Sequence, residues 1–264
     1  MAKVRVGQIE IFYREDGHGD HVVWIQGLGL DHRGWAFQTP LFSQHFCCLT
    51  FDNRDAGQTG RSPGAYTIKT MADDTIGLMD ALAIKHAHIV GLSMGGAIAQ
   101  ELAIHYPARV RRLVLVATYT SGDPRGTALL NSFVQMRARF TREEYLRAIS
   151  PWLFSYQDYL IPGLVESAIK KGMEDPYFLP PKVYARQVEA ATSHFTEDRL
   201  KRIKAPTLIV AGEDDLLTPM RFARTLHEAI PGARLAVIQG TGHGLIWSRA
   251  EEFNALLLSF LKET

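Results

Sequence analysis

The sequence has only two cysteines, which excludes a disulfide-stabilised scaffold. Cys47 and Cys48 are adjacent in an apolar stretch of a chain of 264 residues. Neighbouring residues of a strand point to opposite faces, so a disulfide between them would be strained. We therefore expect two buried thiols in a protein that stays in a reducing compartment.

Net charge and long apolar runs are also missing. The chain carries 29 Lys and Arg against 28 Asp and Glu, a formal charge of +1, so it offers no basic surface for nucleic acid or an anionic membrane. No segment reaches the length of a membrane span, and the first residues lack the apolar core of a signal peptide. We expect a cytoplasmic protein that binds a small molecule and neither nucleic acid nor a membrane. A homo-oligomer is compatible with the sequence.

Metal-ligand patterns are a further absence. No pair of histidines or cysteines has ligand spacing together with a supporting carboxylate, so we expect neither a metal nor a cofactor. Internal repeats and low-complexity tracts are absent too. What remains is an ordinary globular composition, with 46% hydrophobic and 22% charged residues, in a chain long enough for one large core.

Short apolar stretches alternate with helical patterns along most of the chain. The alternation predicts an α/β fold with a doubly wound, mostly parallel sheet. Residues 4–13 predict a β-hairpin at the edge of this sheet, because apolar and polar residues alternate around Gly7-Gln8. The other expected strands are 22–25, 46–51, 88–92, 110–117, 206–211 and 235–238, and the expected helices include 34–44, 71–82, 94–105, 220–230 and 250–261.

The alternation stops in the middle of the chain. Residues 124–200 are helical in pattern and rich in aromatic residues, methionine and proline, with a capping box from Thr141 to Glu144. We interpret this segment as a helical cap inserted into the core. The expected division is a core of residues 1–122 and 201–264 and a cap of residues 123–200.

One serine lies in a sequence that is typical of a nucleophile. Gly91-Leu92-Ser93-Met94-Gly95 follows a predicted buried strand and precedes a helix rich in small residues. A sharp strand-to-helix turn strains the serine backbone and crowds its neighbours, so glycine is needed on both sides. The serine hydroxyl then stands above the N-terminus of a helix, where negative charge is stabilised.

A serine hydroxyl needs a base to remove its proton, and the base needs a third group to orient it. His243 lies between glycines after the last predicted strand, and Asp215 follows the strand that ends at residue 211. Reactive groups gather at the carboxyl ends of parallel strands, so these two side chains can reach Ser93. Asp214 and, less favoured, Asp123 are alternative positions for the acid.

The order Ser93, Asp215, His243 resembles that of the α/β-hydrolase superfamily, and the resemblance covers residues 1–120 and 200–264. It implies an oxyanion hole formed by the backbone N–H groups of Leu28 and Met94. Relatives usually carry His-Gly before this position, where the chain has Gln26-Gly27. The loop Asp52–Gly57 resembles a family loop, with Asp55 in place of the usual glycine, and we interpret it as structural.

Within the superfamily the chain looks most similar to small serine carboxylesterases and to 3-oxoadipate enol-lactonase-like proteins. This resemblance implies hydrolysis of small, largely apolar esters or lactones through an acyl-enzyme. Apolar residues in loops and in the expected cap are candidates to contact the substrate, beside Met94. These candidates are Trp35, Tyr119, Trp152, Phe154, Leu216, Ile246 and Trp247.

Three other functions stay open. Carbon–carbon bond hydrolases that act on vinylogous diketones share the Ser-Met-Gly-Gly run, but they usually have Asn and Trp where this chain has Leu92 and Gly244. Perhydrolases usually have an aromatic residue at the position of Leu28. A receptor that binds a small apolar ligand would not need the three catalytic side chains.

Overall fold

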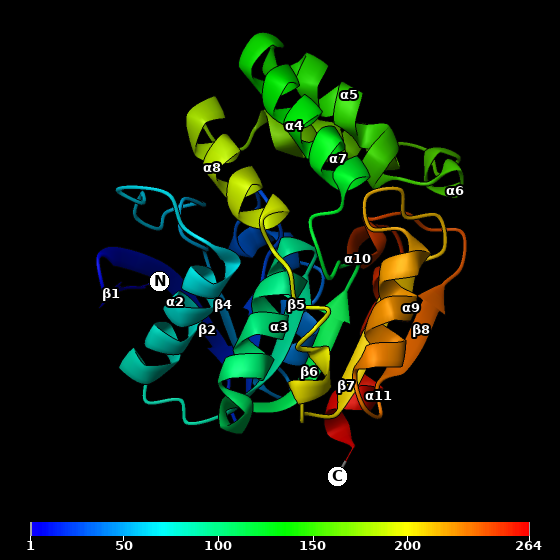
Figure 1. Ribbon diagram of the computed structural model, residues 1–264. Coiled ribbons are helices and arrows are strands. Elements are labelled where there is room, and N and C mark those ends of the chain that lie inside the picture. The colour runs from blue at the N-terminus through cyan, green and yellow to red at the C-terminus, as the bar shows by residue number, and fades with distance from the viewer. Residues whose placement is uncertain (1, 264) are drawn as a thin grey trace.

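An eight-stranded sheet forms the core of the computed structural model, which describes residues 2–263 (Figure 1). The strand order is β1-β2-β4-β3-β5-β6-β7-β8, and all pairs from β4 to β8 are parallel. The predicted doubly wound, mostly parallel α/β fold is confirmed. The strands are β1 (Ala2–Val6), β2 (Ile9–Gly17), β3 (His21–Ile25), β4 (Cys47–Phe51), β5 (Ala87–Leu92), β6 (Val110–Val116), β7 (Thr207–Gly212) and β8 (Arg234–Ile238).

The first two strands form the expected hairpin at one edge of the sheet. They pair antiparallel, with Val4 opposite Ile11 and Val6 opposite Ile9. Gly7 has a φ of +53° in the turn between them, a conformation that glycine adopts without strain. On its other side, β2 pairs antiparallel with β4, so the parallel part of the sheet begins at β4.

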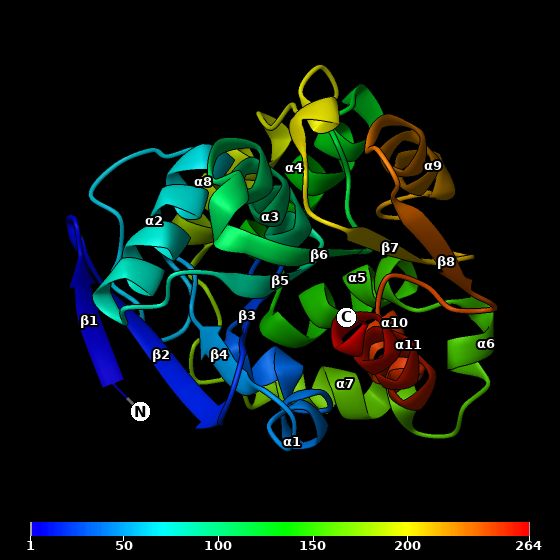
Figure 2. The same ribbon diagram turned by 90° about the horizontal axis from the view of Figure 1, so that it is seen from below.

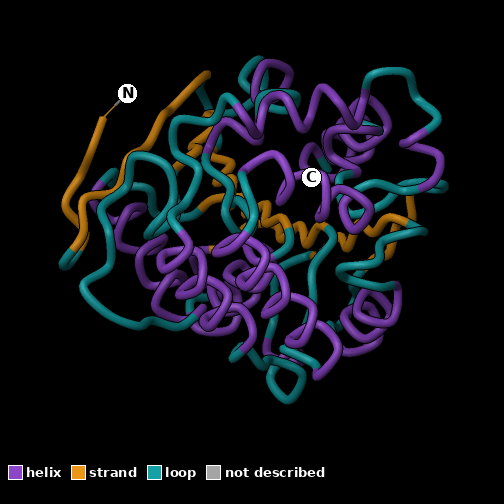
Figure 3. Tube along the Cα trace, turned by 90° about the horizontal axis from the view of Figure 1, so that it is seen from above, coloured by secondary structure: helices purple, strands orange, loops and turns teal. Residues whose placement is uncertain are grey.

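Helices cover both faces of the sheet, as the views from below and above show (Figures 2 and 3). Alternate residues of each buried strand point to opposite faces, and Ile89 and Val90 of β5 therefore belong to different apolar clusters. One face packs against α2 (Ile68–Ala81), α3 (Met94–His105) and α9 (Met220–Ala229). The other face packs against α1 (Thr39–Phe42), α10 (Leu245–Ser248) and α11 (Ala250–Lys262).

The helix expected over 34–44 is broken in two. A short 3-10 turn, η1 (His32–Trp35), precedes α1, and Pro40 lies at the start of α1. Proline has no backbone N–H and clashes with a preceding helical turn, so it begins a new helix here. Two further 3-10 turns are η2 (Pro107–Arg109) and η3 (Leu200–Arg202).

Five helices lie above the carboxyl ends of the parallel strands (Figure 1). They fall within the segment for which a cap is predicted. The expected capping box is confirmed at α5, where Thr141 Oγ1 accepts from the Glu144 backbone and the Glu144 carboxylate accepts from Thr141 N. The helices are α4 (Pro124–Arg139), α5 (Arg142–Leu153), α6 (Tyr156–Tyr159), α7 (Leu164–Met173) and α8 (Pro181–Thr192).

The two cysteines are free thiols in different environments. Cys48 is buried, and burial raises its pKa to about 12. The expectation that both are buried is wrong for Cys47, which is half-buried and lies near Glu15. Because the two side chains point to opposite faces of β4, the strand exposes one of them.

No helix within residues 2–263 combines the length and the apolar character needed to cross a membrane.

We predict that acid lowers the free energy of unfolding, because two histidines are buried. Burial lowers the pKa of His88 to about 4 and that of His194 to about 3. An unfolded histidine has a pKa near 6.5, so between about pH 6.5 and 4 the unfolded chain binds more protons than the native chain, and stability is lost as the pH falls. Each histidine contributes up to about 1.4 kcal/mol per pH unit in this window.

Urea unfolding at several pH values between 7 and 4.5 measures this effect. We expect the free energy of unfolding of His88→Gln to fall less steeply with acid than that of the wild type. Carboxylates act equally in both proteins, so the difference isolates His88. The exposed His18 supplies the matched control, His18→Gln, which should keep the wild-type slope. Equal slopes for His88→Gln and the wild type would contradict the assignment.

Candidate active site

Ser93 occupies the turn between β5 and α3. Its backbone has φ 55° and ψ −118°, a conformation that non-glycine residues rarely adopt. Hydrogen bonds on both sides hold it there, because Ser93 N donates to Val116 O at 2.8 Å and Ser93 O accepts from Gly96 N and Thr118 Oγ1 at 2.9 and 2.7 Å. The strained turn predicted around this serine is present.

The glycines around Ser93 are required by close backbone packing. A Cβ on Gly91 would lie 2.3 Å from Gly95 O, and a Cβ on Gly95 would lie 2.1 Å from Ile25 O. Neither backbone oxygen can move away without breaking the turn or the adjoining strand. The third close approach is at Gly27, where a Cβ would lie 3.2 Å from Ser93 Cβ.

Asp215 and His243 come together from loops that follow β7 and β8. The distance from Asp215 Oδ2 to His243 Nδ1 is 2.8 Å, and both side chains are buried. The other carboxylate oxygen accepts from Leu217 N and Thr218 N, each at 2.8 Å. This hydrogen-bond network places a proton on Nδ1 of His243 and leaves Nε2 free to accept one.

The alternative acids lie elsewhere. Asp214 is exposed, and its backbone N–H donates to Thr241 O. Asp123 caps α4 by accepting from Arg125 N and Gly126 N, and it pairs with Arg221 at 2.8 Å. Of the three candidate carboxylates, only that of Asp215 hydrogen-bonds to His243.

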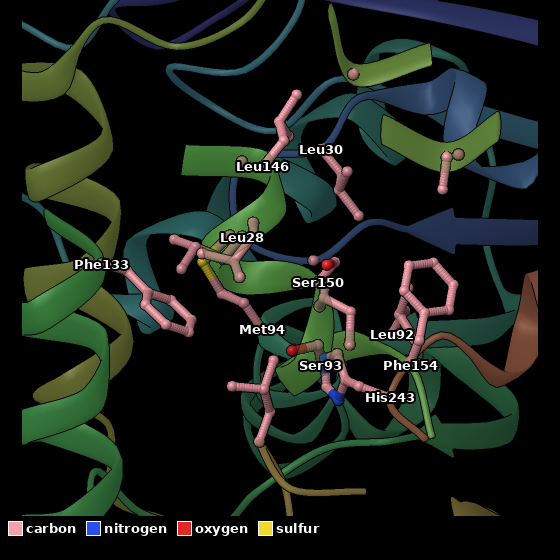
Figure 4. Close-up of a pocket in the computed structure, with 18 of the residues that line it drawn as sticks. Leu28, Leu30, Leu92, Ser93, Met94, Phe133, Leu146, Ser150, Phe154 and His243 are labelled. Carbon is pink, nitrogen blue, oxygen red and sulfur yellow. The ribbon is translucent and has the colours of Figure 1, made fainter. Parts of the chain in front are cut away.

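Ser93 and His243 line the same cavity, which has a volume of about 930 Å³ and lies between the sheet and the helices above it. Figure 4 shows the Ser93 hydroxyl and the His243 ring directed toward the same end of this cavity. The structure contains no hydrogen bond between these two described side chains. Such contacts commonly tighten only when a substrate is bound, so the arrangement is compatible with proton transfer.

Two unpaired backbone donors flank Ser93. Leu28 follows Gly27 in the loop after β3, and Met94 is the first residue of α3. Within residues 2–263, the N–H groups of Leu28 and Met94 have no hydrogen-bond acceptor. Backbone donors next to a helix N-terminus and close to a serine can stabilise negative charge on a neighbouring oxygen.

The loop that carries Leu28 is fastened to α8. Gly29 N donates to the side-chain oxygen of Gln187 at 2.9 Å, and the Gln187 amide nitrogen donates to Arg54 O at 3.0 Å. Gln187 is fully buried. It therefore joins the loop after β3, the loop after β4 and a helix of the predicted cap. No local sequence signal marks Gln187, because its partners are far away along the chain.

Asp55 strengthens the same connection. It has a φ of 68° and is fully buried, and its carboxylate accepts from Ser62 N and Tyr66 Oη and from both Nε and Nη2 of Arg186, at 2.8 to 3.0 Å. Asp55 thus braces the core, in agreement with the structural interpretation of its loop, and also anchors α8 through Arg186. Burial and the adjacent Asp55 carboxylate raise the pKa of Tyr66.

Three of the seven expected pocket residues line the cavity, namely Tyr119, Phe154 and Trp247. Leu28 and Met94 line it as well. Apolar side chains that sequence reasoning did not select complete much of the wall. Among them are Leu30, Leu92, Leu130, Phe133, Leu146 and Leu217.

The other four expected pocket residues lie outside the cavity wall, and these positions correct the expectation. Trp35 and Ile246 are fully buried against the sheet, in the cluster that also contains Trp24. Trp152 packs against Phe133 within the helices above the sheet. Leu216 is exposed, and the next residue, Leu217, lines the cavity instead. Trp35 and Ile246 turn away from the cavity because large apolar side chains are buried wherever a second layer covers them.

One buried group of potential metal ligands lies near the cavity, formed by Asp31, His32 and Asp52. Protein donors already use these atoms. His32 Nδ1 lies 2.7 Å from Asp52 Oδ1, which also accepts from His32 N, and Asp31 Oδ1 accepts from Arg33 N. The second group, Glu15, His21 and Cys47, lies near the surface on β2 to β4.

Comparison with known proteins identifies clear relatives. The family model described as alpha/beta hydrolase fold matches residues 20–250. The chain is 29% identical over 241 residues to RutD of Caulobacter sp., which is named as a carbamate hydrolase, with 91% of this chain and 90% of the relative covered. It is 31% identical to BpoC of Mycobacterium tuberculosis, named as a non-heme bromoperoxidase, with 96% and 97% covered.

The fold has equally clear counterparts among solved structures. The enol-lactonase from Burkholderia xenovorans is 28% identical to this chain and superposes with a TM-score of 0.89. The match covers 99% of this chain and 100% of that protein. The similarity therefore includes the helices above the sheet as well as the strands that carry Ser93, Asp215 and His243.

Proposed function

The chain belongs to the alpha/beta hydrolase fold family, and from this premise we propose that it is a serine hydrolase that cleaves carboxylic esters or lactones. The observation that carries the proposal is the meeting, at one cavity, of a serine on a strained turn with a histidine that is hydrogen-bonded to a buried aspartate. This arrangement has the components of acyl transfer by a nucleophilic serine.

In the proposed first step, His243 Nε2 takes the proton from the Ser93 hydroxyl as Ser93 Oγ attacks the substrate carbonyl carbon. Leu28 N and Met94 N donate to the oxygen that becomes negatively charged. The bond from the carbonyl carbon to the alcohol oxygen then breaks, and His243 returns the proton to the leaving alcohol. Asp215 keeps the proton on Nδ1 and stabilises the imidazolium.

The acyl group is then attached to Ser93 as an ester, and water removes it. His243 takes a proton from the water molecule as the water oxygen attacks the acyl carbonyl. The bond from the acyl carbon to Ser93 Oγ then breaks, and His243 returns the proton to Oγ, which releases the acid and restores the Ser93 hydroxyl. In a lactone the leaving alcohol belongs to the same molecule as the acyl group, so the two steps yield a single hydroxy acid.

Two observations support small, largely apolar substrates. The cavity wall near Ser93 consists mainly of apolar side chains, including Leu28, Met94, Phe154 and Trp247. An apolar wall favours an apolar acyl or alcohol group. Among the solved structures, the similar protein from Burkholderia xenovorans is an enol-lactonase, and its match covers 99% of this chain. A carbamate is also attacked at a carbonyl carbon, so the relation to RutD fits the same chemistry.

Mixing the protein with p-nitrophenyl butyrate in a stopped-flow instrument tests the proposal. We expect a burst of about one p-nitrophenol per protein molecule, followed by steady turnover, because acylation releases the phenol before water removes the acid. A panel of lactones, carbamates and a vinylogous diketone gives the substrate class. Turnover of the diketone without ester cleavage would favour a carbon–carbon hydrolase. Binding of apolar ligands without any turnover would favour a receptor, and either result would overturn the proposal.

A further inference from the structure

Arg137 is a buried cation in the helices above the sheet, and it lines the same cavity as Ser93. Its residue surface is 9% exposed, and it is the only lysine or arginine that is buried within residues 2–263. Phe133 lies one helical turn earlier on α4 and points into the cavity (Figure 4). Residues four apart share a helix face, so Arg137 is on the cavity side of α4.

The Arg137 guanidinium uses only part of its hydrogen-bonding capacity. Its Nε donates to Leu179 O at 2.9 Å. The two terminal nitrogens carry four further N–H groups, and these have no acceptor in the part of the chain that the structure describes. Arg137 also makes no ion pair with a described acidic residue. A buried cation of this kind is costly unless it meets an acceptor.

Aromatic rings stabilise the charge without supplying that acceptor. The centre of the Arg137 guanidinium lies 3.6, 4.6 and 4.8 Å from the ring centres of Phe178, Tyr184 and Tyr145. Such contacts favour a cation, but N–H groups bond only weakly to ring faces. All three rings line the cavity, so the aromatic box that holds Arg137 is open to it.

The four acidic side chains at the cavity wall do not compete for Arg137, because each of them already has a cationic partner. Asp31 and Asp175 both pair with Arg33. Asp123 pairs with Arg221, and Glu174 lies within 4.0 Å of Lys170. The charge of Arg137 is therefore left for a molecule that enters the cavity.

We propose that Arg137 forms a subsite for a carboxylate at the far end of the acyl chain of the substrate. The proposal rests on the proposed hydrolase function and adds a substrate class, namely esters or lactones whose acyl chain ends in a carboxylate. A planar guanidinium with free terminal N–H groups matches a carboxylate with two parallel hydrogen bonds. Leu28 and Phe133 supply apolar wall in the same cavity, which suits a hydrocarbon chain between the two ends.

Contact distances place this subsite near the loop that carries Leu28. A Cβ on Gly29 would lie 3.4 Å from the Tyr184 ring, and Tyr184 is one of the three rings around Arg137. The loop after β3 therefore borders the proposed carboxylate subsite through Gly29, and its residue Leu28 lines the same cavity as Ser93. A substrate that reaches both Arg137 and Ser93 has to match the separation of the two groups, so a series of increasing chain length will show an optimum.

Two esters of matched length test the proposal. Mono-p-nitrophenyl suberate and p-nitrophenyl octanoate have the same acyl length and differ in the terminal carboxylate. We expect Arg137→Gln to raise KM for the suberate ester by about 10- to 100-fold, the effect of losing hydrogen bonds to a charged group. KM for the octanoate ester should change less than about 3-fold, which also shows that the variant is folded. Shorter dicarboxylic monoesters then locate the length optimum.

Two further variants sharpen the comparison. Arg137→Lys keeps the charge but loses the planar pair of donors, so its KM for the suberate ester should lie between those of the wild type and Arg137→Gln. Arg139 is exposed on the same helix, and Arg139→Gln should resemble the wild type for both esters. Equal losses for both esters in Arg137→Gln, or no loss for either, would overturn the carboxylate subsite while leaving the hydrolase function intact.

Calorimetric titration with suberate separates the two proposals. We expect suberate to bind the wild type and not Arg137→Gln, whether or not either ester is hydrolysed. If neither ester is cleaved but suberate binding depends on Arg137, the hydrolase function fails and the subsite stands. Suberate binding that is the same in both proteins, or absent from the wild type, would overturn the subsite. Titration with inorganic phosphate shows whether the site prefers a carboxylate, and tighter phosphate binding would contradict our assignment.

Discussion

Replacing Ser93 with alanine is expected to lower kcat for p-nitrophenyl butyrate by at least about 10³-fold without unfolding the protein. The variant loses the oxygen that would attack the carbonyl carbon, and no neighbouring group can take its place in the turn. The cost to folding is small, because alanine has the same Cβ as serine and therefore the same backbone strain at φ 55°. The Ser93 hydroxyl makes no hydrogen bond to a described residue, so its removal leaves no unpaired partner.

The measurement combines stopped-flow kinetics with thermal unfolding of the same samples. Ser150 provides a matched control, because it also lines the cavity and is drawn in Figure 4. Its hydroxyl donates to Arg147 O and contacts Tyr159 Oη, so it is already engaged in structure. We expect Ser150→Ala to retain kcat within about 3-fold. A Ser93→Ala variant that keeps the burst of p-nitrophenol would show that another residue is the nucleophile.

Local patterns made the sheet and the turn at Ser93 predictable. Continuous apolar runs identify strands that are covered on both faces, and β5 to β7 are such strands. The turn at Ser93 has an equally short sequence signal, Gly91 to Gly95, and Gly91 is required by the nearby Gly95 O, whereas Gly95 is required by Ile25 O of β3. The single helix predicted over 34–44 is wrong, because Pro40 has no backbone N–H and begins a new helix.

The cavity wall was harder to predict because it depends on contacts between distant segments. Trp35 and Ile246 are large and apolar, as pocket residues often are. The structure instead buries them on the face of the sheet that packs against α1, α10 and α11. Arg186 pairs with Asp55, which lies 131 positions away in the chain. No local pattern in the sequence could therefore predict this ion pair. Arg137 lies in a helix with an ordinary amphipathic pattern, and only the three rings around it show that it is buried.

Replacing Asp215 with asparagine is expected to lower kcat by about 10⁴-fold, with little effect on stability. One carboxylate oxygen accepts from Leu217 N and Thr218 N, so the oxygen of the introduced amide will occupy that position. Its NH₂ group then takes the place of Oδ2, which lies 2.8 Å from His243 Nδ1. An NH₂ group donates to Nδ1, and the imidazole proton moves to Nε2, where it prevents acceptance of the Ser93 proton.

Asp214→Asn and Asp123→Asn are the matched controls, since these are the other two positions at which the acid could be expected. Asp214 is exposed, and Asp123 is occupied with the N-terminus of α4 and with Arg221. Each control should keep kcat within about 3-fold, whereas Asp123→Asn should lower the melting temperature slightly, because it removes a negative charge from the N-terminus of α4 and the ion pair with Arg221. A large loss in Asp214→Asn with an active Asp215→Asn would mean that the loop after β7 presents a different carboxylate to His243 during turnover. The three variants make the same chemical change. The difference between their kcat values therefore depends on which carboxylate orients the His243 imidazole.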